Sequence, residues 1–390
     1  MGEREEGIRT VLFVLFRWMV THGWAAPDGL FGAPVFRAAL AVMLSFLVVL
    51  LFGGQVIRWL MRLKVGDLPE FHHTALNELT KNKKNTPTMG GIIIIGAILL
   101  TCLLLADVQN FYVEMAIVCM VWLAVLGAID DWLKLTQGRR TPGSRDGLYA
   151  WEKMLFQVGL GVLLAVFIYK HPMIVSGSGP IAVEGAHKLN WPFLPKEWVL
   201  PAVLFAVLTV VVITGSSNAV NLTDGMDGLA SGCMVIVAFS FMMLTYVTGD
   251  YRWSRLLNLN QVKDTAELAI MCGAMTGACL GFLWYNCNPA QVFMGDTGSL
   301  ALGGTIGYVA IVIRQEPMLL LVGGIFVIEA MSVMMQVSYF RITGGKRIFL
   351  CSPIHHHFHL KGWSEQQVVV RFWLISAICA AFGLAIVKLR

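Results

Sequence analysis

The sequence predicts an all-α, polytopic membrane protein with about ten transmembrane helices. Of its 390 residues, 57% are hydrophobic and only 14% are charged, whereas soluble domains carry about 25% charged residues. The apolar residues gather into ten runs, each close to the roughly 20 residues that a helix needs to cross a bilayer. Lysine and arginine concentrate in alternate loops between these runs, as expected when those loops face the cytoplasm.

Residues 1–36 precede the first run and are predicted to form an N-terminal interfacial segment. Their apolar stretch, residues 11–20, is too short to cross a membrane and contains Arg17. A signal peptide cleaved near Ala25 is the alternative, and the acidic residues at the start of the chain disfavour it. We therefore expect two parts, this segment and a ten-helix transmembrane domain over residues 37–390.

The ten predicted spans leave nine loops, whose charges predict the topology. The spans cover residues 37–60, 91–107, 111–128, 154–170, 198–215, 229–248, 266–284, 299–313, 318–340 and 370–388. Loops one, three and nine hold the basic clusters, so the odd-numbered loops are predicted to be cytoplasmic and both termini to lie outside. Loop four is long and poor in basic residues and is expected outside. The Gly323-Gly324 pair predicts a bend in the ninth span.

Loop five contains a concentrated polar stretch, residues 218–228, between two uncharged apolar runs. It holds Asn221, Asp224 and Asp227 together with two glycines. Side-chain oxygens and flexible backbone at a membrane surface suit a cation or a phosphorylated ligand. An ordinary turn is the alternative, because Asn, Asp and Gly are turn formers. Asp227 is also a candidate cap for the sixth span.

Loop three opens with two adjacent aspartates, Asp130 and Asp131, directly after an apolar span. Carboxylates near a helix C-terminus are unfavourably placed for the helix dipole, so a purely structural role is disfavoured. Their mutual repulsion favours a bound cation or a raised pKa suited to a general base. Lys134 follows in the same loop. Lys153, at the start of the fourth span, is a candidate phosphate contact or a snorkelling lysine.

Loop seven ends in Gly295-Asp296-Thr297-Gly298, which places a carboxylate on a glycine-flanked turn that opens a helix. Backbone N–H groups at such a turn suit an anion, and Asp296 suits a metal that bridges to it. An aspartate that only caps the helix is the alternative. Phe293 could stack on a planar base or pack against apolar neighbours.

Loop nine contains a histidine run within residues 353–359. The run lacks the cysteine or spaced carboxylate of a zinc site, so contacts to phosphate or to a nucleotide are favoured. Glu329 and Gln336 lie inside the ninth span and are functional candidates, because polar groups within a membrane are costly. At the end of loop one, Lys83 and Lys84 either meet phosphate or only supply positive-inside charge.

The predicted cytoplasmic loops therefore combine carboxylates with lysines and histidines. Hard carboxylate oxygens suit Mg²⁺ or Mn²⁺, and a divalent cation with basic residues suits phosphoryl chemistry on an anionic substrate. The sequence contains no Walker A, GxSxG or HExxH motif, and no basic tract that would form a nucleic-acid groove. The eight cysteines form no CxxC pair and are expected to be core residues. A cation-coupled transporter is the alternative, although its ion site would normally lie near mid-bilayer.

Five segments resemble the bacterial phospho-N-acetylmuramoyl-pentapeptide transferase (translocase I) family. They are NTPTMGG (85–91), AIDDWLK (128–134), NAVNLTDGMDG (218–228), FLWYNCNPAQVFMGDTGS (282–299) and PIHHHFHLKGW (353–363). The resemblance implies Mg²⁺-dependent transfer of phospho-N-acetylmuramoyl-pentapeptide from UDP-MurNAc-pentapeptide to undecaprenyl phosphate, giving lipid I and UMP. It also implies a homodimer in the inner membrane with a cytoplasmic active site. A relative that transfers N-acetylglucosamine-1-phosphate is the alternative within this chemistry.

The resemblance also implies roles for individual residues. Asp296 is the implied magnesium ligand, and Asp130 and Asp131 are the implied aspartate pair, with Asp130 acting on the lipid phosphate. The implied catalytic residues also include Lys83 and His355. The predicted substrate-binding residues are Asn221, Asp224, Asp227, Asn286, Phe293, Lys134, Lys153, Gln336 and His356. Two positions depart from the family pattern, because Asn85 replaces a glycine and His359 replaces an acidic residue.

Overall fold

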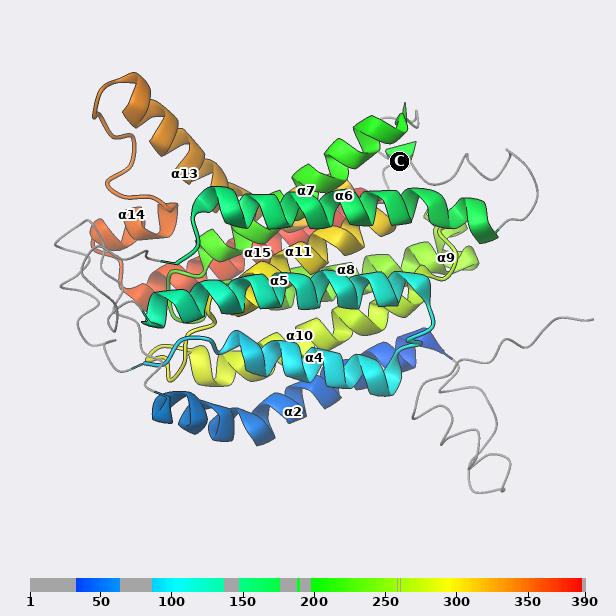
Figure 1. The fold of residues 1–390 in the computed structure, drawn as a ribbon, viewed down its shortest axis with the longest axis horizontal. Helices are drawn as coiled ribbons and strands as arrows, with labels where there is room; N and C mark the ends of the chain where they lie inside the picture. Colours follow the sequence, from blue (N-terminus) through cyan, green and yellow to red (C-terminus); the bar gives the residue numbers. More distant parts are fainter. Residues whose placement is uncertain are drawn as a thin grey trace, which may run out of the picture.

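The computed structural model describes residues 33–63, 86–136, 147–175, 188–189, 198–257, 259 and 261–387. Long helices run roughly side by side in one bundle (Figure 1). They are α2 (Pro34–Arg62), α4 (Gly91–Leu105), α5 (Phe111–Thr136), α6 (Ala150–Val175), α7 (Ala202–Thr223), α8 (Leu229–Gly249), α10 (Leu268–Asn286), α11 (Gly295–Val312), α13 (Gly324–Ile342) and α15 (Glu365–Ile386). Shorter helices are α9 (Tyr251–Leu256), η4 (Thr265–Glu267), α12 (Glu316–Val322) and α14 (Ile354–Leu360).

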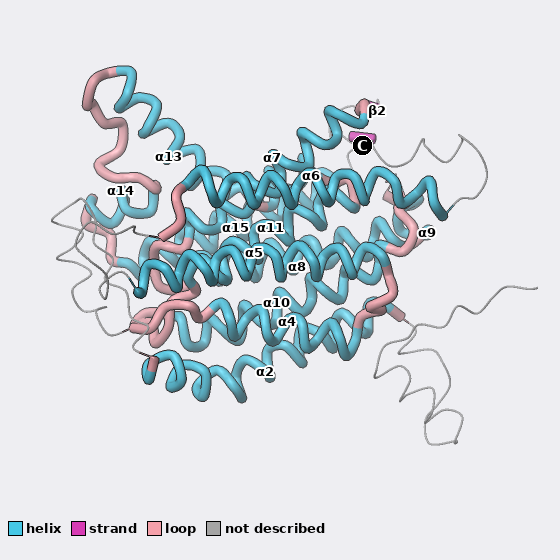
Figure 2. Tube along the Cα trace, in the orientation of Figure 1, coloured by secondary structure: helices cyan, strands magenta, loops and turns pink. Residues whose placement is uncertain are grey.

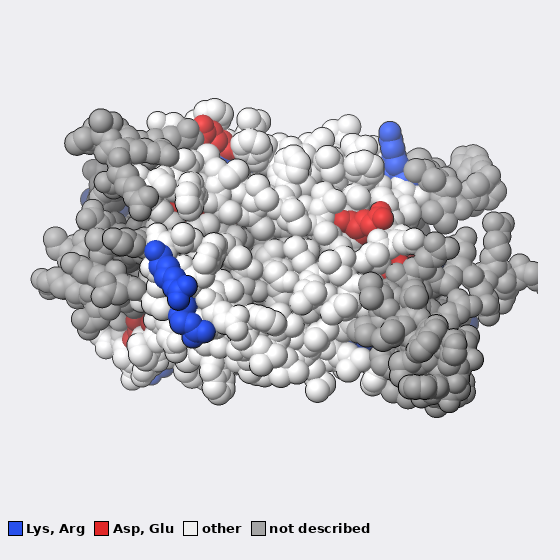
Figure 3. All heavy atoms as spheres, turned by 60° about the horizontal axis from the view of Figure 1, so that its bottom comes forward, with Lys and Arg blue, Asp and Glu red and all other residues white. Residues whose placement is uncertain are grey.

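Helix dominates the described chain, as the trace in Figure 2 shows. The one sheet in the described ranges is a minimal antiparallel pair, β1 (Lys188–Leu189) with β2 (Trp198–Val199). Within the residues that the structure describes, eight helices are long and apolar enough to cross a membrane. The other two predicted crossings correspond to α4, with 15 residues, and α11, with 18. A wide uncharged band crosses the middle of the face drawn in Figure 3. The predicted all-α, multi-pass membrane class is confirmed.

Two helices extend well beyond the predicted ends of their spans. α5 continues to Thr136 instead of ending at residue 128, and α7 continues to Thr223 instead of residue 215. The expectation that Asp130, Asp131 and Asn221 lie in loops is therefore wrong. The apolar pattern stops where polar side chains acquire partners inside the protein, and the helical backbone continues past that point.

The ninth predicted span is divided at Gly323 into α12 and α13, so the predicted bend is confirmed. Beyond the break, α13 leans away from the rest of the bundle (Figure 1, orange). The chain then returns through α14, which contains most of the histidine run, so this run is a short helix and not part of an irregular loop.

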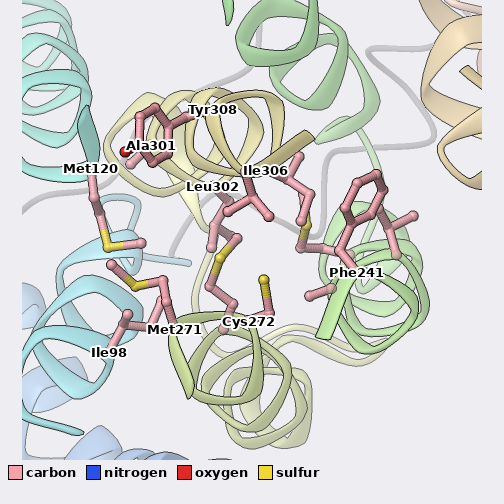
Figure 4. Close-up of a cluster of buried hydrophobic side chains, with 14 of the residues drawn as sticks. Ile98, Met120, Phe241, Met271, Cys272, Ala301, Leu302, Ile306 and Tyr308 are labelled. Atoms are coloured by element: carbon pink, nitrogen blue, oxygen red, sulfur yellow. The ribbon is translucent and has the colours of Figure 1, made fainter. Parts of the chain in front are cut away.

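The core of the bundle is built around α11, in which every residue from Thr297 to Val312 is buried. α11 packs against α4, α5, α7 and α8. Figure 4 shows side chains from the surrounding helices, among them Met120, Phe241 and Met271, gathered around Leu302 and Ile306. Small residues allow the close approach, because a Cβ on Gly303 would lie 2.4 Å from the Ser216 carbonyl oxygen.

A buried ion pair connects helices at the end of the bundle opposite α14. The Arg37 guanidinium donates to Glu267 Oε2 at 2.9 Å and to the Leu105 carbonyl oxygen at 3.1 Å. The same end holds the start of α2 and the end of α15 (Figure 1). Residues 1–32, most of the predicted interfacial segment, lie outside the described residues.

We predict that Gly91→Ala destabilises the protein, because a Cβ at this position would lie 2.2 Å from the backbone nitrogen of Gly298 on α11. Overpacking of this kind costs about 1–3 kcal/mol. Thermal unfolding in detergent measures the effect. Gly96→Ala on the same helix is the control, because a Cβ there meets no atom within 4 Å. Equal melting temperatures for the two variants would contradict the expected constraint.

Candidate functional site

Polar residues from four helices, α5, α6, α7 and α11, meet at the end of the bundle where α14 lies. Asp130 and Asp131 come from the last turns of α5, and Asp296 comes from the first turn of α11. One carboxylate oxygen from each lies within 4.8 Å of the others. Carboxylate oxygens at this spacing are suited to hold a hard divalent cation.

Asp130 is fully buried and is held by two lysines. Its Oδ2 lies 2.7 Å from Nζ of Lys134, one turn along α5, and 2.7 Å from Nζ of Lys153 on α6. Its Oδ1 accepts a 2.7 Å hydrogen bond from the backbone of Leu148, at the entrance to α6. The structure thus brings the three predicted residues Asp130, Lys134 and Lys153 into direct contact.

Asp296 shares the same lysines. Its Oδ2 lies 2.6 Å from Nζ of Lys153 and 3.4 Å from Nζ of Lys134. Its Oδ1 accepts a 2.8 Å hydrogen bond from the Asn221 amide, which also donates to Ser299 Oγ at 2.9 Å. With three carboxylates and two ammonium groups, the cluster has one negative charge in excess when all are ionised, which favours cation binding.

Asp131 faces the backbone of α11. Its Oδ1 accepts from the N–H of Asp296 at 3.1 Å, and its Oδ2 accepts from the N–H and hydroxyl of Thr297 at 3.0 and 2.7 Å. It therefore caps the positive end of α11 from a neighbouring helix. These two N–H groups are engaged with Asp131, so the expectation that they bind an anion is corrected. The lysines are the available phosphate contacts.

Asp224 immediately follows α7, and the backbone of Gly295 hydrogen-bonds its carboxyl group. Burial, followed by the negative charges of Asp296 and Asp131, raises the pKa of Asp224 to about 7. Asp224 is therefore able to gain or lose a proton near neutral pH beside the cluster, as a general acid or base requires.

Asp227 is buried and hydrogen-bonds to two other segments, the loop after α10 and the start of α15. Its Oδ2 accepts from the Asn288 amide and from the backbone N–H of Ala290, both at 3.1 Å. Its own N–H donates to Glu365 Oε1 at 2.9 Å. In this structure Asp227 joins the loop after α7 to the loop after α10 and to α15, and its substrate-binding role stays a prediction.

Asn286 is also engaged with the protein, with only 2% of its surface exposed. Its Oδ1 accepts from the Gly228 N–H and from Ser231 Oγ, both at 3.0 Å, and its amide donates to the Val292 carbonyl at 2.8 Å. These bonds shape the loop that leads to Asp296. Contact between Asn286 and a nucleoside stays a prediction.

Phe293 is half-buried and lies where loops one and seven pair. Its N–H donates to the Pro87 carbonyl oxygen, and its own carbonyl oxygen accepts from the Gly90 N–H, each at 2.8 Å. The pairing places the end of loop one beside the turn that carries Asp296. Lys83 and Lys84, predicted to reach this site, lie outside the described residues.

Gln336 and the histidines form a separate group around α13 and α14. Gln336 Oε1 accepts from the N–H groups of Ile348 and Phe349 at 3.0 Å, and its side chain lines a cavity of about 280 Å³. His355 is fully buried and His356 is nearly so. The structure brings His355 against Gly225, next to Asp224.

Some residues that shape the site were missed in the sequence. A Cβ on Gly127 would lie 2.2 Å from the Asp296 carbonyl oxygen, so only glycine allows α5 to approach the α11 turn. Its position three residues before Asp130 was the available signal. Thr297, Ser299 and Glu365 also hold predicted site residues, and their types alone do not reveal this.

We predict that the two adjacent aspartates differ in their effect on stability. Asp131→Asn places an NH₂ group against donors on α11, and breaking such buried hydrogen bonds costs about 1–3 kcal/mol. Asp130→Asn leaves the cap of α11 intact, so we expect a smaller loss. Thermal unfolding of both variants in detergent measures the difference, and a larger loss for Asp130→Asn would contradict it.

Two family models match this chain. Residues 113–314, just over half the chain, match the family described as glycosyl transferase family 4, and residues 83–95 match phospho-N-acetylmuramoyl-pentapeptide-transferase signature 1.

Curated relatives named phospho-N-acetylmuramoyl-pentapeptide-transferase span nearly the whole chain. The protein from Desulfotalea psychrophila is 42% identical over 91% of this chain and 93% of its own length. The one from Thermodesulfovibrio yellowstonii is 42% identical over 91% and 94%, and that from Koribacter versatilis is 40% identical over 93% and 96%. With this identity over nearly its full length, the chain belongs to the phospho-N-acetylmuramoyl-pentapeptide-transferase family.

Proposed function

We propose that this protein transfers phospho-N-acetylmuramoyl-pentapeptide from UDP-MurNAc-pentapeptide to undecaprenyl phosphate, producing lipid I and UMP. The observation that carries the proposal is the cluster of Asp130, Asp131 and Asp296 with Lys134 and Lys153 at one end of a membrane bundle. Both proposed substrates are anionic at the reacting atoms. One is a membrane lipid, so both can meet only at a membrane surface.

Mg²⁺ is the proposed cofactor, and Asp296 is its proposed principal ligand. Oδ1 of Asp296 is held by Asn221, whereas Oδ2 contacts only lysines among its described partners. Oδ2 is therefore the oxygen that can turn to a cation without breaking the Asn221 contact. Bound Mg²⁺ would neutralise charge on the diphosphate and on the departing UMP.

Lys134 and Lys153 supply the remaining positive charge. Both ammonium groups are shared between Asp130 and Asp296 and are partly exposed, at 31% and 20% of their side-chain surface. An incoming phosphate can compete for them, which would release the Asp130 carboxylate toward the acceptor. This sequence of contacts accounts for the proposed action of Asp130 on the lipid phosphate.

We further propose that the prenyl chain lies in an apolar groove beside the bent ninth span. The structure has a cavity of about 380 Å³ between α7, α12 and α13, lined among others by Val211, Val220, Val327 and Met334. Its lining is almost entirely apolar, as a hydrocarbon chain requires. Val220 directly precedes Asn221 on α7, so this end of the groove lies one residue along the helix from the amide that holds Asp296.

The topology and assembly belong to the same proposal. The proposed site faces the cytoplasm at the bacterial inner membrane, with both termini outside, and the basic loops one, three and nine support this orientation. The polar residues of loops five and seven come together at the same end of the bundle as α14, which supports the parity of the loops. A homodimer is proposed from the family resemblance.

The function is tested by product formation in detergent, without a membrane gradient. We expect UDP-MurNAc-pentapeptide and undecaprenyl phosphate to yield lipid I and UMP, whereas UDP-N-acetylglucosamine yields no lipid product. Turnover of UDP-N-acetylglucosamine alone would point to the related N-acetylglucosamine-1-phosphate transferases. Absence of any product with a folded, Mg²⁺-supplied protein would contradict the proposal and reopen a transport role.

We predict that Asp296→Ala reduces turnover more than about 100-fold, because even outer-shell partners of a metal are worth about 10–100-fold. The measurement is UMP release as a function of Mg²⁺ concentration. Asp250→Asn is the matched control, since Asp250 caps α9 at the other end of the bundle and asparagine is an equally good cap. Near-normal turnover and Mg²⁺ dependence in Asp296→Ala would contradict the metal role.

A further inference from the structure

A buried carboxylate on α13 has no place in the proposed chemistry. Glu329 is fully buried, and neither of its oxygens has a hydrogen-bond partner within the described part of the chain. Nδ1 of His355, which also has no hydrogen-bond partner among the described residues, lies 3.1 Å from Glu329 Oε2. Burying a carboxylate in a membrane helix is energetically unfavourable, and an imidazole at this distance can offset part of that free energy.

The other side of the same imidazole faces the loop after α7. A Cβ on Gly225 would lie 2.4 Å from Nε2 and 2.9 Å from Cε1 of His355, so the ring lies directly against this glycine. Gly225 is exposed and follows Asp224, whose carboxyl group contacts the α11 turn. His355, itself fully buried, is therefore placed between Glu329 and a loop of the site.

We propose that Glu329 is a positioning residue, which fixes the His355 ring so that it supports the Asp224-Gly225 loop. Because Nδ1 lies beside the carboxylate, turning the ring would move this nitrogen away from a buried acid, so Nε2 stays against Gly225. This inference rests on the proposed function and on the predicted substrate-binding role of Asp224, which this loop carries. Glu329 acts through His355 and does not itself touch substrate.

The geometry separates this role from binding of the lipid. The groove-lining residues of α13 are Phe326, Val327, Ala330, Met331 and Met334. Glu329 is not among them and faces α14. We therefore expect substitutions of Glu329 to affect the soluble substrate, whereas bulky substitutions of its groove-lining neighbours affect the lipid.

Steady-state kinetics of the full-length protein in detergent test the proposal. Glu329→Gln should raise KM for UDP-MurNAc-pentapeptide about 10-fold, the lower range for loss of an orienting partner, with KM for undecaprenyl phosphate unchanged. Glu329→Asp, which keeps the charge, should be less impaired than Glu329→Gln. The double variant Glu329→Gln with His355→Gln should have the same KM for UDP-MurNAc-pentapeptide as His355→Gln alone, because both substitutions disrupt the same contact between Glu329 and His355.

A second variant approaches the same contact from the loop and does not disturb the helix interior. Gly225→Ala should push the ring away and raise the same KM, without an additive effect in combination with Glu329→Gln. Gly159→Ala is the control, because a Cβ there meets no atom within 4 Å. Wild-type turnover of the two substrates, measured first, decides the proposed function separately.

Three outcomes would overturn the positioning role while leaving the enzyme activity established. They are additive losses in the double variants, an unchanged KM for the UDP substrate in Glu329→Gln, or a raised KM for the lipid alone. A lower melting temperature with unchanged kinetics would likewise reduce Glu329 to a structural residue.

Discussion

The hydrogen bonds from the first turn of α11 to Asp131 are the contact on which the site depends. The carboxylate receives two backbone N–H groups and a hydroxyl, which fixes the turn against α5. A helix N-terminus would otherwise attract any anion. Here the N–H groups at the start of α11 bind the Asp131 carboxylate, which holds Asp296 in place. Anionic ligands from solution are then left to bind Lys134 and Lys153.

Close packing makes this contact possible. The turn approaches α5 and α4 so tightly that a Cβ on Gly127 or Gly91 would lie 2.2 Å from the backbone of α11. Every residue of α11 after Asp296 is buried, so close packing on all sides prevents the helix from shifting away from α4 and α5. The position of Asp296 is therefore set by the core of the bundle, and a rigid carboxylate is what a metal-dependent site needs.

Hydropathy was sufficient to predict the membrane class and the approximate spans, and the Gly323-Gly324 pair predicted the break in the ninth span, because these features depend on local composition. The ends of α5 and α7 were not predictable in this way. Asp130, Asp131 and Asn221 look like loop residues until their partners on other helices are known. The sequence also could not distinguish Asp130 from Asp131, since neighbouring residues on a helix point about 100° apart and meet different elements. Asp227 and Asn286 illustrate the same limit. The family resemblance implies substrate contacts for both, which stay predictions, whereas only the structure shows that their side chains bond to loops of the protein.

The proposed encounter of a lipid with a nucleotide follows from the course of one helix. α7 lines the apolar groove with residues such as Val211 and Val220, and its next residue, Asn221, holds Asp296. An acceptor chain lying in this groove would have its phosphate near the end of α7 that carries Asn221. The loop that continues from α7 carries Asp224, and its Gly225 lies against His355. α7 and the loop after it thus connect the proposed lipid groove, the contact of Asn221 with Asp296 and the Asp224 loop, so a displacement of α7 would disturb the proposed sites of both substrates together.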